Sequence, residues 1–296
     1  MPPPLLIVDV PWLLYRSFFA LPKSIAGADG QPVNALLGTV NAILSVCEAR
    51  AHDDARAPVR GVVACMGAEQ AGYRVALYPA YHAHRDPMPD GLARQWQRAP
   101  ALLEGLGWTF ATSERLEADD VMFSFAREED EHRGAALLLT GDRDLYAAVN
   151  ERVSVLELRK GGEQAQLGPE QVRERYGVEP AQVPDLIALR GDPSDGLPGA
   201  PGVGAKTAAE LLRAHSSLEA ALEAADAPAS GMRPRTAAAL RENAELLRTF
   251  KRVATLQRIE VERPRDRGTD FDGGAQVARE YGMRRLAERL AQLARA

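Results

Sequence analysis

Glu117-Ala-Asp119-Asp120, followed after the apolar run 135–139 by Thr140-Gly-Asp142-Arg-Asp144, is the stretch that decides the fold of this chain. Glu117 and Asp120 are three residues apart, so they share one face of a helix whose apolar residues can pack behind them. Asp142 and Asp144 follow an apolar strand, and open α/β sheets place their ligands at that carboxyl end. Converging carboxylates repel one another and lose hydration, which divalent metal would offset. The stretch predicts a metal site, with two unrelated acidic surface turns as the alternative.

Composition bounds the class of protein. With 296 residues and 46% hydrophobic content, the chain has room for one large or two smaller domains. The net charge of -5 argues against a basic coat for nucleic acid but not against DNA binding, since the clustered carboxylates carry much of it. Cys47 and Cys65 lack metal-site spacing, so we expect both to be buried and reduced. Without a basic leader or a membrane-length apolar run, the chain is expected to be a cytoplasmic monomer with no membrane contact.

Short apolar runs alternate with helical segments in the first half of the chain. The runs 5–8, 61–65 and 153–158 are predicted strands; the first ends in Asp9, whereas the second ends at Met66-Gly67 without a carboxylate. This alternation predicts a mostly parallel α/β sheet covered on both faces. Composition shifts near Gly161-Gly162, which divides the chain into a sheet domain, 1–162, and a helical domain, 163–296. The helices expected in the second are 169–176, 183–190, 206–215, 218–225, 235–253 and 281–293, the last packing back on the body.

A second informative stretch is Gly191-Asp192-Pro-Ser-Asp195, continued by Gly202-Val-Gly204-Ala-Lys206. Its glycines allow a tight hairpin between helices that can point backbone N–H groups at a phosphate, and Lys206 adds charge. It is not a nucleotide-binding P-loop, because Ala205 replaces the glycine before the lysine and a helix precedes the stretch instead of a strand. The two aspartates could complete the metal site from the second domain.

Several motifs occur together in a fixed order: Asp9 after the first strand, Tyr15-Arg16-Ser-Phe-Phe-Ala-Leu-Pro, Tyr81-x-x-x-Arg85, Glu117-Ala-Asp-Asp-Val, Thr140-Gly-Asp-Arg-Asp-Leu, and Gly191 through Lys206-Thr-Ala-Ala. Over about residues 5 to 260 the chain resembles the bacterial 5′ nuclease family, the 5′-3′ exonuclease and flap endonuclease module also found at the N-terminus of DNA polymerase I. The resemblance implies a PIN-like nuclease domain and a helix-three-turn-helix near 185–212. It also implies a stand-alone nuclease acting in DNA replication and repair.

The resemblance assigns roles residue by residue. It implies two Mg²⁺ or Mn²⁺ ions, the first held by Asp9, Glu117, Asp119 and Asp120 and the second by Asp142, Asp144, Asp192 and Asp195. It makes Arg16, Arg74, Tyr81 and Arg85 DNA contacts near the cut, while Gly202, Gly204 and Lys206 hold the duplex at a distance, with a monovalent cation at the Gly202–Gly204 hairpin. Such phosphate contacts give register without reading sequence. The expected partner is DNA with a 5′ flap, a nick or a 5′-ended duplex.

Two positions depart from the family pattern. The usual second-strand Asp is missing at Met66-Gly67, with nearby Glu69 as a candidate replacement, and the usual catalytic Lys is His82. An imidazole is mostly neutral at pH 7, so it replaces that cation only when protonated. We therefore predict a weakened first metal and reduced cleavage. Two alternatives stay open: a paralogue that binds branched DNA without cutting it, and a ribonuclease or nucleotide enzyme, which the duplex-holding hairpin disfavours.

Overall fold

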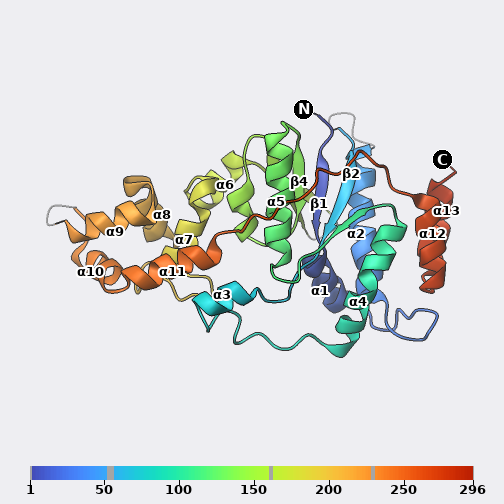
Figure 1. Ribbon diagram of the computed structural model, residues 1–296, viewed down its shortest axis with the longest axis horizontal. Coiled ribbons are helices and arrows are strands. Elements are labelled where there is room, and N and C mark those ends of the chain that lie inside the picture. The colour runs from blue at the N-terminus through green and yellow to red at the C-terminus, as the bar shows by residue number, and fades with distance from the viewer. Residues whose placement is uncertain (1, 52–56, 160–162, 228–230, 296) are drawn as a thin grey trace.

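A six-stranded sheet forms the centre of the computed structural model, which describes residues 2–51, 57–159, 163–227 and 231–295 (Figure 1). The strand order is β3-β2-β1-β4-β5-β6, and only β6 runs antiparallel to its neighbour. The strands are β1 Leu5–Asp9, β2 Gly61–Cys65, β3 Thr109–Ala111, β4 Ala136–Leu139, β5 Val153–Leu158 and β6 Gln164–Leu167. The predicted mostly parallel α/β sheet is confirmed.

The central strand sets the position of the site. Leu5 pairs in register with Gly61 on one side and with Ala136 on the other. All five residues of β1 are buried, as expected for a parallel strand covered on both faces. Because β1 and β4 run in the same direction, Asp9 and the residues after Leu139 emerge at one edge of the sheet.

Helices cover both faces of the sheet. On one face lie α1 Val10–Ala20, α2 Asn34–Ala51 and α4 Asp90–Gly105, which share a buried cluster with Leu6 and Val8. On the other face lie α5 Ala118–Glu131 and the short helix η1 Asp144–Ala148, packed with Leu5 and Ile7. The short helix α3 Gly72–Leu77 lies between the sheet and the helical domain (Figure 1). Both cysteines are free; Cys65 is buried as expected, whereas Cys47 is only partly buried.

The helical domain extends from one end of the sheet. Its elements are α6 Pro169–Tyr176, η3 Pro180–Gln182, α7 Val183–Arg190, α8 Ala205–His215, α9 Leu218–Asp226, α10 Pro234–Glu242 and α11 Ala244–Ala254. The expected single helix over 235–253 is two helices, interrupted at Asn243. The predicted boundary at Gly161-Gly162 lies outside the described residues.

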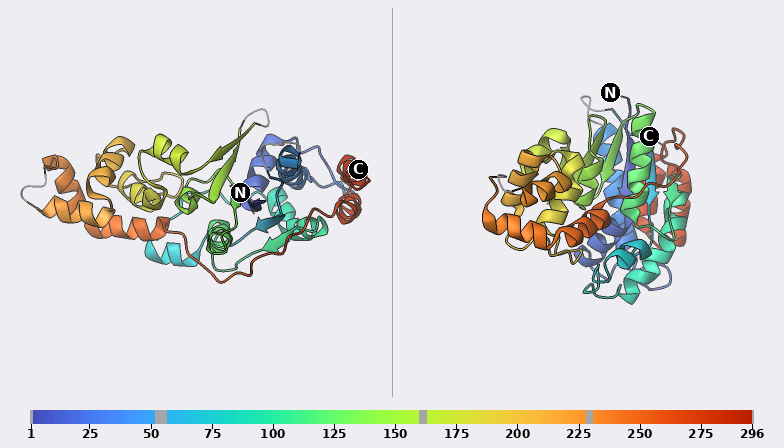
Figure 2. Two further views of the ribbon diagram at one scale, coloured as in Figure 1. Left: turned by 90° about the horizontal axis from the view of Figure 1, so that it is seen from above. Right: turned by 60° about the vertical axis from the view of Figure 1, so that its left-hand side comes forward.

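The C-terminal helices α12 Phe271–Glu280 and α13 Arg284–Leu293 lie at the opposite end of the molecule from the helical domain (Figure 2). Leu286 and Leu290 join the buried cluster of α2 and α4, and a Cβ added at Gly105 would lie 2.5 Å from the Val277 side chain. The prediction that all of 163–296 forms one domain is therefore wrong at its C-terminal end. Packing of the last helix on the body is confirmed, and the body it packs on is the sheet domain.

The segment 255–270 connects these two ends by running along α5 (Figure 2). We call it the strap. The Ile259 amide donates to the Ser124 hydroxyl, Arg263 pairs with buried Glu129, and the Arg267 amide donates to the Arg60 carbonyl. A coil segment this well bonded fixes α5 from outside. Within the described part of the chain, no helix combines the length and apolar character that a bilayer span requires.

Candidate metal and DNA site

The loops after β1 and β4 are joined at the carboxyl edge of the sheet. Asp9 caps α1, because its Oδ1 accepts a hydrogen bond from the Trp12 amide at 2.9 Å. Its Oδ2 accepts from the Thr140 hydroxyl at 2.7 Å, and the same hydroxyl oxygen accepts from the Asp142 amide at 2.9 Å. Thr140, which the sequence analysis quoted in a motif without giving it a role, thereby fixes Asp9 and Asp142 relative to each other.

Four predicted carboxylates line one open cavity: Asp9, Glu117, Asp119 and Asp142. Burial, only partly offset by the hydrogen bonds from Thr140 and Trp12, raises the pKa of Asp9 to about 6. Burial also raises the pKa of Asp119 well above its usual range, and the charges of Asp142 and Asp9 raise it further. These side chains, distant in sequence, are therefore close enough to repel one another.

Asp142 also belongs to a second group of carboxylates, with Asp144, Asp192 and Asp195. Burial raises the pKa of Asp144 well above its usual range, and the charges of Asp142, Asp195 and Asp192 add to the effect. The pKa of Asp142 is itself raised, first by burial and then by Asp195 and Asp192. The structure thus brings acidic side chains of the helical domain to the acidic edge of the sheet.

The donor chemistry of this edge fits divalent magnesium or manganese. All seven residues of the two groups offer carboxylate oxygens, the hard ligands that these ions take. Over the described residues, however, no three His, Cys, Asp or Glu side chains are already arranged to hold one ion. The carboxylates are neighbours, but they do not form a complete coordination shell. A bound ion would draw them inward, because its positive charge would lower their mutual repulsion.

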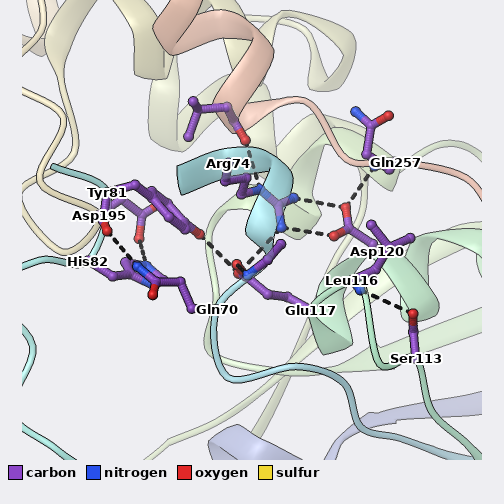
Figure 3. Close-up of polar contacts among 12 residues, drawn as sticks. Gln70, Arg74, Tyr81, His82, Ser113, Leu116, Glu117, Asp120, Asp195 and Gln257 are labelled. Carbon is purple, nitrogen blue, oxygen red and sulfur yellow. Dashed lines mark hydrogen bonds and ion pairs between the residues drawn. The ribbon is translucent and has the colours of Figure 1, made fainter. Parts of the chain in front are cut away.

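Arg74 and Asp120 bind each other (Figure 3), and neither of them lines the cavity. The two nitrogens of Arg74 donate to the two oxygens of Asp120 at 2.8 Å each, and both side chains are buried. Arg74 also donates to the Val253 carbonyl, while Asp120 accepts from the Gln257 amide. We therefore correct two expectations: Asp120 is not placed as a metal ligand, and Arg74 is not placed as a DNA contact.

The buried ion pair is surrounded by further charge. Burial lowers the pKa of Arg74, but the carboxylates of Glu117 and Asp120 outweigh this, so the net shift is upward and Arg74 stays charged. Glu117 accepts hydrogen bonds from the Ala71 amide at 2.7 Å and the Tyr81 hydroxyl at 2.9 Å (Figure 3). Tyr81 is only 3% exposed, so the expectation that it contacts DNA is also corrected.

His82 is held against Asp195 (Figure 3). Its Nε2 lies 2.9 Å from an Asp195 carboxylate oxygen, and its ring stacks on Tyr81 with centroids 3.8 Å apart. The residue adopts a φ of 57°, which is uncommon for a side-chain-bearing residue, and its buried Nδ1 has no hydrogen-bond partner among the described residues. His82 is therefore occupied as a tie between residues 78–85 and the helical domain, and is not placed as a free substitute for the family lysine.

The remaining predicted DNA contacts are exposed. Arg85 lines the cavity, is about half exposed and pairs with Asp195 at 3.2 Å. Arg16 is exposed and donates to the Leu158 carbonyl. Gly202 and Gly204 lie exposed between α7 and α8, and Lys206 is exposed in the first turn of α8. In this connection Gly199 and Gly202 adopt left-handed φ values of 68° and 78° that favour glycine.

The end of β2 offers no carboxylate to the cavity. Met66 is buried on the face of the sheet that α1, α2 and α4 cover. A Cβ at Gly67 would lie 2.4 Å from the Leu116 carbonyl oxygen. Glu69 lines the cavity instead, exposed and accepting a hydrogen bond from the Tyr15 hydroxyl at 3.0 Å. Position 67 is therefore closed to side chains by the backbone of the loop before α5.

Comparisons with known proteins identify the family of this chain. A family model described as the 5′-3′ exonuclease N-terminal resolvase-like domain matches residues 4–177, and the C-terminal SAM fold of the same family matches 178–266. This chain belongs to the 5′-3′ exonuclease family. It is 36% identical to a 5′-3′ exonuclease of Mycobacterium tuberculosis, over 97% of this chain and 96% of that protein.

Two further proteins are similar to this chain, one in sequence and one in fold. Thermostable DNA polymerase I of Thermus thermophilus is 35% identical over 90% of this chain, which corresponds to 31% of the polymerase. The solved flap endonuclease of bacteriophage T5, whose crystals contain DNA and metal ions, superposes with a TM-score of 0.66 over 99% of both chains at 18% identity. That identity shows the shared fold alone. The family and fold expected from the motifs are confirmed.

Proposed function

We propose that this 5′-3′ exonuclease family member is a divalent-metal-dependent, structure-specific nuclease that hydrolyses DNA phosphodiesters at 5′ ends or flaps. The observation that carries the proposal is the convergence of acidic side chains from both domains, with Asp142 close to Asp9 and Asp119 on one side and to Asp192 and Asp195 on the other. Such a concentration of negative charge repels a bare phosphate, so it serves phosphate chemistry only when metal is bound.

Each acidic residue has a proposed position. Asp9, Glu117 and Asp119 would hold the first metal ion and Asp144, Asp192 and Asp195 the second, with Asp142 between the two groups. When bound, divalent metal supplies Lewis acidity at the scissile phosphate. Thr140 positions Asp9 and Asp142 through its hydroxyl, and His82 orients Asp195. Glu69 is the carboxylate that best replaces the missing one on the β2 loop.

DNA is held at two separate places in this proposal. Arg85 and Arg16, both exposed beside the cavity, bind phosphates near the cut. The hairpin with Gly202, Gly204 and Lys206 binds duplex backbone, with a monovalent cation at Gly202–Gly204. Phosphate contacts of both kinds give register and not base sequence, so the substrate is selected by its shape. The DNA and metal ions in the T5 flap endonuclease crystals agree with this proposal.

The proposal is tested with a labelled 5′-flap DNA, titrated with Mg²⁺ and separately with Mn²⁺. We expect cleavage that disappears in Asp142→Asn, together with a high metal requirement because β2 contributes no carboxylate. Binding without cleavage at every metal concentration would overturn the proposal in favour of a DNA-binding paralogue. Asp272→Asn serves as the matched control, because Asp272 is also acidic but lies exposed on α12, at the opposite end of the molecule from the helical domain.

A further inference from the structure

The second group of carboxylates is assembled from both domains. Asp142 and Asp144 follow β4 of the sheet, whereas Asp192 and Asp195 follow α7 of the helical domain. These four side chains can hold one ion only if α7 keeps a fixed position relative to the sheet domain. We propose that residues 251–257, the end of α11 and the start of the strap, set this position and thereby position the second metal ion. We call these residues the junction, and the proposal rests on the proposed nuclease function.

On one side, the junction is tied to α7. The helix α11 packs on α7 (Figure 1), and Phe250 shares a buried cluster with Ile187. The Lys251 ammonium lies 2.6 Å from a carboxylate oxygen of Asp185. Asp185 is only 5% exposed, so its charge has lost most of its water and depends on this partner. Because α7 is one helix of eight residues, fixing Asp185 in its first turn also fixes Asp192 after its last turn.

On the other side, the junction is tied to the sheet domain. The Val253 carbonyl accepts a hydrogen bond from Arg74 Nε at 3.0 Å, and the Gln257 amide donates to Asp120 at 2.7 Å. Arg74 and Asp120 in turn bind each other, and Arg74 lies 3.4 Å from Glu117 of the first group (Figure 3). Arg74 belongs to α3 and Asp120 to α5, and both are buried, so the junction and α5 are held as one unit.

The junction opposes the repulsion within the second group. Asp192 and Asp195 lie close enough to Asp144 that their charges raise its pKa. Like charges brought together in this way push α7 and the sheet apart as long as no metal is bound. The ion pair between Lys251 and Asp185 resists this movement, because separating its partners would leave a buried charge alone. Lys251 is therefore a positioning residue, which acts on the second group through α7.

The test follows bound Mn²⁺ and needs no cleavage. Two Mn²⁺ ions about 3.5–4 Å apart, the spacing of two-metal sites, give a spin-coupled electron paramagnetic resonance spectrum, whereas separate ions give the spectrum of isolated Mn²⁺. Wild-type protein should show the coupled spectrum. Lys251→Ala should reduce the coupled signal and weaken binding of the second Mn²⁺ roughly 2- to 30-fold in a calorimetric titration, with the first unchanged. Lys251→Arg keeps a cation within reach of Asp185 and should restore both.

Arg248→Ala is the matched control. Arg248 also lies on α11, but it pairs with Glu219 of α9 instead of with α7. Its loss should leave both the coupled spectrum and the titration unchanged. Thermal melts of the metal-free proteins show which variants are folded. If Lys251→Ala unfolds, the double variant Lys251→Met with Asp185→Leu takes its place, because it leaves no buried charge unpaired and should still lose the coupled signal.

The outcomes separate this proposal from the nuclease proposal. A coupled spectrum and a second Mn²⁺ affinity that stay at the wild-type level in a folded Lys251 variant overturn the role of the junction alone. The nuclease proposal then still stands or falls on the cleavage of 5′-flap DNA. A wild-type protein that binds no pair of Mn²⁺ ions overturns both proposals.

Discussion

Arg74 and Asp120 form a two-pronged ion pair closed off from solvent, with both nitrogen–oxygen distances at 2.8 Å. One residue lies on α3 and the other on α5, and their remaining hydrogen bonds reach α11 and the strap. The pair thus joins four segments behind the acidic edge.

Removing one partner of this ion pair should lower the stability of the protein more than removing both partners. Asp120→Asn takes the two-pronged counter-charge from a buried guanidinium and leaves it Glu117, 3.4 Å away, which costs about 3–5 kcal/mol of unfolding free energy, and Arg74→Met should behave similarly. The double variant Arg74→Met with Asp120→Leu should recover part of that loss. Urea unfolding monitored by circular dichroism measures all three. The exposed pair Arg258 and Glu131 is the control, and losing it should change stability little; equal effects at both pairs would contradict this account.

Asp9 should make the metal-free protein less stable as pH rises. Its folded pKa of about 6 exceeds its ordinary value of 3.8, so its favourable contribution is complete below about pH 4 and is lost as pH rises through 6. In EDTA, Asp9→Asn should therefore exceed wild type by about 2–3 kcal/mol near pH 7.5, and the gap should narrow by pH 5. Calorimetric melts at both pH values measure it. A gap independent of pH would show that Asp9 is not shifted; added Mg²⁺ should stabilise wild type more than the variant.

Installing the missing family carboxylate should fail at Gly67. A Cβ there would meet the Leu116 carbonyl at 2.4 Å, so Gly67→Asp should lower stability by about 1–3 kcal/mol without lowering the Mg²⁺ concentration needed for cleavage. Gly72→Ala is the control, since no atom lies within 4 Å of its added Cβ. Metal titrations of flap cleavage, together with thermal melts, test this prediction. Cleavage by Gly67→Asp at a lower Mg²⁺ concentration than the wild type needs would refute the steric argument.

Lys206 should act on duplex DNA through charge alone. Lys206→Ala should weaken binding at every sequence and reduce the slope of log affinity against log salt by about one phosphate contact. Fluorescence anisotropy at several salt concentrations gives the slope. Arg279→Ala, an exposed cation on α12 at the other end of the molecule, should leave it unchanged. An unaltered slope for Lys206→Ala would remove the hairpin from the DNA interface.

The sequence predicted the fold wherever a pattern was local. The apolar runs predicted β2 and β5 at their observed bounds, and the helix expected over 169–176 is α6. Strands β3 and β6 were missed, because one has three residues and the other, at the sheet edge, has four, Gln-Ala-Gln-Leu, of which Leu is the single large apolar one. The amphipathic pattern of 281–293 predicted a packed helix, but such a pattern does not identify the surface that receives it.

The sequence predicted a list of acidic residues for the site, but not the role of each residue. The spacing of Glu117 and Asp120 predicted a shared face, and both carboxylates do lie beside one guanidinium, that of Arg74, at 3.4 and 2.8 Å. Arg74 precedes Asp120 by 46 residues, and no local pattern reveals this partner. Trp12 and Trp96, which line the same cavity as the carboxylates, were missed for the same reason, since they become neighbours of the acidic edge only through tertiary packing.

The strap also bears on when the protein becomes competent during its synthesis. Arg74 and Asp120 obtain their Val253 and Gln257 partners only after the chain has been made beyond residue 257. A nascent chain that has not reached the strap lacks these bonds, so we expect α5 to be loosely fixed until the strap has been made. Stalled chains ending near residue 250 should be digested by protease within α5, whereas chains that include the strap should resist. The acidic edge would thereby be held in place only once the strap has been made.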